Sequence, residues 1–177
     1  CTTRAPMALP RAVAPAGLAP ALPASPFLNY QSALRLKTRK GNEALAAIRE
    51  PYFSRTYGAY CGHQNTPYRL EVAGHPAVTR RGGVIACAHA LDRLYYSSGA
   101  YVHRALFAGL LRSLHGRPMV HAQMPSAGRV SLLHFPDRGQ YVLHLLYASP
   151  LQRGRCAVIE DMPPLRNVRV ALRLPMA

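Results

Sequence analysis

Two cysteines each precede a histidine by two positions, and these pairs are the residues best suited to chemistry. Cys61 precedes His63, and Cys87 precedes His89. A thiol and an imidazole can act together as nucleophile and base, and alternate residues of a strand point to the same face. One hypothesis is therefore a small free-standing hydrolase that acts on an ester or a lactone. The simpler interpretation, which we favour, is a buried structural cysteine beside a hydrogen-bonded histidine.

Arg55 lies in the same polar segment as the first pair. This segment, residues 51–76, is rich in Tyr, Gly, His and Pro and shows no periodicity, which predicts a long structured loop. A guanidinium stays charged and can stabilise an oxyanion, and an imidazole can accept a proton near neutral pH. If the loop is structural instead, we expect Arg55 to pair with Glu50 or with a backbone carbonyl.

A metal site is the third kind of chemistry that the residues allow. Neither HxH nor HxxxH spacing occurs, and calcium prefers six or more oxygen ligands. The sequence implies no firm cofactor, and a divalent metal is an open alternative for the hydrolase. Its candidate ligands are His63, His75, His89 and Asp92 on one side and Glu160 and Asp161 on the other.

Glycoside hydrolysis needs two carboxylates about 5–10 Å apart across the sugar. The chain has 7 acidic residues, of which only Glu160 and Asp161 are neighbours. Adjacent residues of a strand point to opposite faces, so this pair cannot flank one bond. We do not expect glycosidase activity from this chain alone.

The elements that must position these residues follow from local patterns. Glycine-containing turns at residues 80–83 and 136–139 separate β-prone runs, which predicts two hairpins. An apolar stripe at i, i+4 and i+8 predicts a helix over residues 98–115, with His103 facing away from the stripe. Residues 43–50 fit a helix or a strand. Further strands are predicted at residues 33–37, 156–160 and 168–174.

Composition predicts a folded chain with a proline-rich start. Apolar residues make up 49% of the 177 residues, and no run approaches the ~18 residues that a membrane span needs. The first 26 residues contain six prolines, which prevent helix propagation and remove donors from a β ladder. We therefore predict an arm or linker over residues 1–25, an α/β region over 26–116 and a small β-sandwich over 117–177.

The charge is strongly positive but widely spread. There are 22 Lys+Arg against 7 Asp+Glu, a formal net charge of +15, and only Lys37 and Lys40 are lysines. Nucleic-acid binders usually gather charge on one face beside stacking aromatics, so we predict attraction to polyanions but no specific nucleic-acid partner. The 4 cysteines form no CxxC pair, which favours a reduced, cytoplasmic protein. Because the sequence has no membrane span, we expect no membrane partner.

Several blocks, in order, resemble one protein family over residues 26–177. The family comprises β-galactosidase-like glycoside hydrolases with a trimerisation domain after their catalytic barrel. The blocks are residues 26–30, 33–35, 51–57, 61–67, 74–78, 84–89, 142–146, 158–161 and 168–170.

The resemblance implies a partial flavodoxin-like α/β trimerisation domain followed by a small all-β sandwich. The catalytic (β/α)₈ barrel of such proteins needs roughly 200 or more residues, and this chain has no room for one. We therefore expect a non-catalytic assembly module that forms a homo-oligomer. A small-molecule substrate is expected only if the hydrolase hypothesis holds.

Overall fold

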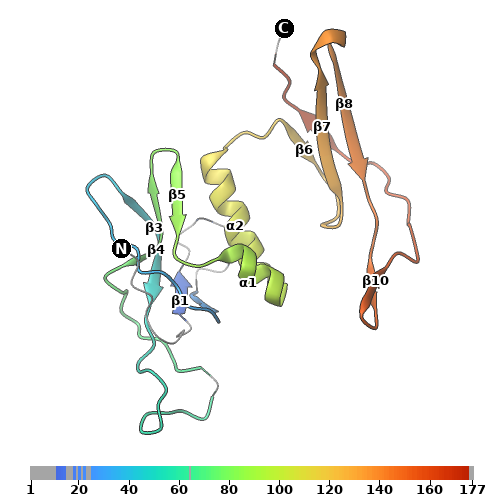
Figure 1. The fold of residues 1–177 in the computed structure, drawn as a ribbon. Helices are drawn as coiled ribbons and strands as arrows, with labels where there is room; N and C mark the ends of the chain where they lie inside the picture. The colour runs from blue at the N-terminus through green and yellow to red at the C-terminus, as the bar shows by residue number, and fades with distance from the viewer. Residues whose placement is uncertain are drawn as a thin grey trace. The chain divides into compact units, whose positions relative to one another are not determined.

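The computed structural model describes residues 11–14, 18, 20, 22, 25–63 and 65–175. The chain divides into two compact units, Cys1–Gly116 and Arg117–Ala177 (Figure 1). Each unit has its own strands.

The first unit is built on a five-stranded sheet in which every neighbouring pair of strands is antiparallel. The strand order is β2-β1-β3-β4-β5. The strands are β1 (Arg11–Ala14), β2 (Phe27–Asn29), β3 (Glu43–Arg49), β4 (Pro76–Arg81) and β5 (Val84–Cys87). The predicted hairpin around residues 80–83 is confirmed, since β4 and β5 pair up to the contact between Arg81 and Val84.

Two helices follow the sheet, α1 (Leu91–Ser98) and α2 (Tyr101–Leu114). Gly99 separates them with a φ of +63°, the left-handed conformation that ends many helices, and its N–H bonds to the Tyr95 carbonyl at 2.7 Å. The predicted helix is confirmed as α2, whereas α1 was missed because only Leu91 and Leu94 of its residues are buried.

The core of the first unit joins the sheet to both helices (Figure 1). Ile48 of β3, Val78 of β4 and Leu106 of α2 are at most 1% exposed. Three alanines, Ala46, Ala77 and Ala88, also belong to this core. The other buried members are Leu91, Leu94 and Leu110.

The predicted flavodoxin-like α/β fold is wrong. Such a fold needs parallel strands, and each parallel connection needs a crossover of a dozen or more residues, usually a helix. Here the strand pairs are antiparallel, and the two helices follow one another after the last strand of the sheet. Over the residues that the structure describes, the regular structure is mostly β, in small separate sheets, with two short helices.

Two local predictions in the first unit also need correction. Residues 33–37 form no strand, although the Leu34 N–H donates to the Ala88 carbonyl at 2.8 Å. Within the predicted arm, the proline-free residues Arg11–Ala14 form β1 and pair with both β2 and β3. Most of the remaining arm lies outside the described residues.

The second unit contains three two-stranded antiparallel sheets. Its elements are β6 (Val120–Ala122), β7 (Arg129–Phe135), a 3₁₀ turn (Pro136–Arg138), β8 (Gln140–Leu146), β9 (Leu151–Arg153), β10 (Cys156–Val158) and β11 (Val170–Leu172). The sheets pair β6 with β11, β7 with β8 and β9 with β10. The predicted hairpin around residues 136–139 is confirmed, as is the β-rich character of this region.

No helix among the described residues has both the length and the apolar character needed to cross a membrane.

Candidate functional site

The long loop between β3 and β4 carries the first group of candidate residues, and backbone contacts hold its base together. Pro51 forms an antiparallel bridge with Tyr68, and the Tyr52 N–H donates to the Pro67 carbonyl at 3.0 Å. The Arg49 guanidinium donates to the Leu70 carbonyl. The predicted long structured loop is confirmed, because its two ends are bonded to each other without forming a strand.

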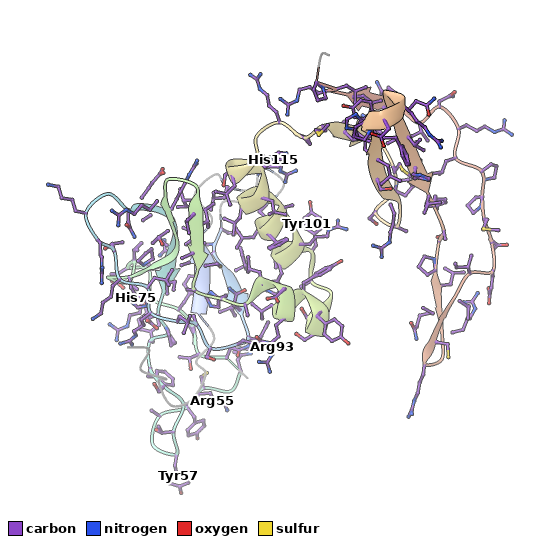
Figure 2. All side chains as sticks on the ribbon, turned by 45° about the horizontal axis from the view of Figure 1, so that its top comes forward. Arg55, Tyr57, His75, Arg93, Tyr101 and His115 are labelled. Atoms are coloured by element: carbon purple, nitrogen blue, oxygen red, sulfur yellow. The ribbon has the colours of Figure 1, made fainter. Side chains whose placement is uncertain are left out.

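Arg55 and Tyr57 lie at the far end of this loop, whereas His75 lies close to the sheet (Figure 2). A tight turn forms this end, with the Thr56 N–H bonded to the Ala59 carbonyl at 2.9 Å. The side chains of Arg55 and Tyr57 are exposed. An oxyanion bound by Arg55 would therefore lie at an open surface.

Cys61 and His63 contact each other, but through the backbone of the histidine. The Cys61 thiol lies 3.5 Å from the His63 carbonyl oxygen and 3.6 Å from the Asn65 carbonyl oxygen, so it donates to the loop backbone. The residue His63 is exposed. The thiol thus stabilises the loop, and the described contacts do not join it to the imidazole.

Glu50 and His75 form a contact that sequence analysis missed. The His75 Nε2 lies 3.2 Å from Glu50 Oε1, and an Arg35 amino group lies 4.0 Å from the same oxygen. Glu50 was expected as a partner of Arg55, and His75 as a metal ligand. The printed sequence separates these residues by long intervals, so no spacing signal could have joined them.

Cys87 and His89 lie at the end of β5 and just beyond it. Burial raises the pKa of the Cys87 thiol, and a hydrogen bond from the His89 backbone lowers that pKa by less. His89 is buried. A raised pKa lowers the thiolate fraction at neutral pH, which disfavours a nucleophilic role for Cys87.

The predicted metal ligands do not gather. Among the described residues no three His, Cys, Asp or Glu side chains are grouped as a metal ion would need. Both carboxylate oxygens of Glu160 accept hydrogen bonds from Arg153, at 2.9 and 2.6 Å. Asp161 is exposed, as is Asp92 in the first turn of α1.

A buried polar pair is the second feature that sequence analysis missed. His103 of α2 is 3% exposed, and its Nε2 lies 2.9 Å from Oδ1 of the fully buried Asn29 on β2. The Phe27 ring packs edge-on to the imidazole at 6.4 Å. The prediction that His103 faces away from the core is wrong. Its spacing from Leu106 and Leu110, i+3 and i+7, was the signal that could have placed it on the buried face.

No protein-family model matches this chain, and no curated protein sequence matches it. Among solved structures, the chain is similar to alpha-L-fucosidase isoenzyme 2 from Paenibacillus thiaminolyticus. The two are 30% identical with a TM-score of 0.85, and the match covers 96% of this chain.

The chain spans only about a quarter of the fucosidase, since the match covers 26% of that protein. The chain therefore resembles part of a glycoside hydrolase in both sequence and structure, as the sequence blocks indicated. The described candidate residues do not form one shared site. They lie in a surface loop, in the contact between Glu50 and His75, at a strand end and in a separate β unit.

Proposed function

We propose that this chain is a non-catalytic assembly module of a glycoside-hydrolase-like protein. The match to about a quarter of a fucosidase supports a non-catalytic part of such a protein, because most of the enzyme lies outside the match. The exposed apolar surface of the second unit supports the assembly role.

This surface is the observation that carries the proposal. No residue is buried among residues 117–175, the part of the second unit that the structure describes. A two-stranded hairpin alone is at best marginally stable in water, and three or more strands or a covering layer are needed. The unit therefore requires apolar partners beyond its own strands.

The hairpin of β7 and β8 shows where such partners would bind. Leu133 pairs with Val142, and these side chains are 47% and 38% exposed. On the other face of the same hairpin, Val130 pairs with Leu145, and both are also exposed. A strand pair that is apolar on both faces is typical of a sheet covered on both sides. We infer that a second copy of the chain covers one of these faces.

The remaining chemistry supports a non-catalytic role. Glu50 lies against His75 and Arg35, and Glu160 lies against Arg153. Two of the seven carboxylates thus have cationic partners, and a glycosidase needs a free pair across the sugar. The hydrolase alternative gains no specific support, because the contact between Cys61 and His63 uses a backbone carbonyl and burial raises the pKa of Cys87.

Sedimentation equilibrium of the full chain tests the assembly role. We expect a mass above that of one chain, and a monomer for the double variant Leu133→Thr and Val142→Thr. Threonine keeps the β propensity of these positions while it removes apolar area.

Val84→Thr is the matched control, because Val84 is an exposed strand residue of the first unit at 69% exposure. It should leave the mass unchanged. A monomeric wild type would contradict the proposal, since the apolar faces would then be covered within one chain. So would an oligomer that both variants leave intact.

A further inference from the structure

Two basic segments that are distant in the sequence meet at one end of the first unit's sheet. Residues 37–40 precede β3, and Arg80 and Arg81 end β4. The strand register joins them, because Glu43 at the start of β3 pairs with Arg80. Figure 1 shows the turn before β3 and the turn between β4 and β5 at the same end of the sheet, opposite the long loop.

Turn geometry fixes both segments. The Asn42 N–H donates to the Arg39 carbonyl at 3.0 Å, and Gly41 adopts a φ of +86°, which favours glycine. In the other turn the Arg80 Nε donates to the Gly82 carbonyl at 3.1 Å. Arg39, Lys40, Arg80 and Arg81 are thus carried on or beside two turns of one sheet, and Lys37 lies just before the first turn. We call this cluster the basic end; it comprises Lys37, Arg39, Lys40, Arg80 and Arg81.

The charges of the basic end are available for a ligand. All its residues except the half-buried Arg80 are exposed. Within the described part of the chain, no ion pair involves Lys37, Arg39, Lys40 or Arg81, whereas Arg35 and Arg153 lie against carboxylates. Glu43 is the one carboxylate within these two turns and the strand ends that carry them. Like charges at one end of a sheet attract polyanions.

The side chains of the basic end favour one class of polyanion over another. Residues 37–43 and 80–84 contain no aromatic side chain. Single-stranded nucleic acids bind largely by stacking bases on aromatic rings, so they fit this surface poorly. Sulfate and carboxylate groups on a sugar chain need only the charged hydrogen-bond donors that Arg and Lys supply.

We propose that the basic end binds an acidic glycan, a sugar chain that carries sulfate or carboxylate groups. The choice of a glycan among polyanions rests on the proposed relation to glycoside hydrolases, but binding does not require assembly. The glycan proposal and the assembly proposal can therefore be contradicted independently. The first is tested by ligand binding, and the second by the mass of the protein in solution.

Binding of defined oligosaccharides to the full chain tests the proposal at about 0.15 M ionic strength, where distant charges are largely screened. The probes are a heparin-type sulfated octasaccharide, an octagalacturonate and a neutral maltooctaose. We expect binding of at least one acidic probe and none of the neutral one, and the better probe identifies the anionic group.

A variant with Lys37, Arg39, Lys40 and Arg81 replaced by Ala should weaken this binding roughly tenfold or more, with a shallower salt dependence. The matched control replaces Arg117, Arg138, Arg155 and Arg166 by Ala, which removes the same charge from exposed positions of the second unit. It should weaken binding less than about threefold. Circular dichroism confirms that both variants fold.

Three outcomes would overturn the proposal. Equal weakening in the two variants would mean that net charge alone attracts the glycan. Tighter binding of a thymidine octanucleotide or of phosphatidylserine vesicles at the same salt would point to a different polyanion. Equal binding of the neutral probe would show that charge is not what the surface recognises.

Discussion

The two units of this protein bury their apolar side chains to different extents. In the first unit two helices pack on a five-stranded sheet, and Ile48 and Leu106 are almost completely buried. In the second unit three separate strand pairs leave every described residue at least partly exposed. A sheet or helix is stable when another layer covers its apolar face. The first unit contains that layer, whereas the described strand pairs of the second unit bury no residue completely.

The largest expected effect tests whether the first unit alone has a tight core. Leu106→Ala removes a side chain that is 1% exposed, and we expect it to lower the free energy of unfolding by about 2–5 kcal/mol. Urea denaturation followed by circular dichroism measures this loss. Leu133→Ala, at a position 47% exposed, should cost less than about 1 kcal/mol in dilute monomer. Equal losses would remove the distinction between the units.

We expect the buried His103 to make the first unit less stable in acid. Burial lowers the pKa of His103 below its ordinary value, so the unfolded chain binds a proton more readily than the folded one. The stability that this residue confers is therefore present above about pH 6.5 and is lost as the pH falls from there toward the folded pKa. The loss is at most about 1.4 kcal/mol per pH unit.

His103→Gln should flatten this pH dependence, because an amide can donate to Asn29 without titrating. The measurement is urea denaturation at several pH values between about 5 and 7.5. His134→Gln, at an exposed position of the second unit, is the control that should keep the wild-type slope. An unchanged slope in His103→Gln would show that another group causes the acid sensitivity.

The two units also differ in the expected reactivity of their cysteine thiols. Cys156 is exposed in the second unit, whereas burial raises the pKa of Cys87 in the first. Because the thiolate is the reactive form, we expect Cys156 to be alkylated roughly tenfold faster or more at pH 7.5. Mass spectrometry of labelled peptides over time gives the two rates. Faster labelling of Cys87 would contradict the burial of that strand end.

The smallest effect is expected where a salt bridge lies in solvent. Arg153 and Glu160 join through two hydrogen bonds, but both side chains are about half exposed. Glu160→Gln should leave the thermal midpoint unchanged, since exposed ion pairs contribute little. Glu50→Gln should lower the midpoint measurably, because its partner His75 is only 17% exposed. Scanning calorimetry separates these outcomes, and a larger effect at Glu160 would reverse the comparison.

Local patterns in the sequence determined the hairpins and the longer helix. The Gly82–Gly83 turn and the turn over residues 136–139 set their strand pairs, because a short loop joins only adjacent antiparallel strands. The same turn sets the observed register, in which His134 lies opposite Tyr141 and His144 opposite Ser131. The apolar stripe of α2 followed from the 3.6-residue period.

Only the tertiary structure decided which distant segments meet. It pairs Arg11–Ala14 with β3, joins Glu50 to His75 and buries His103 against Asn29. These contacts depend on how strands and helices pack, and that choice is made by burial of the whole apolar surface together. The basic end arose in the same way, since its two turns are some forty residues apart in the sequence and adjacent only through the register of β3 and β4.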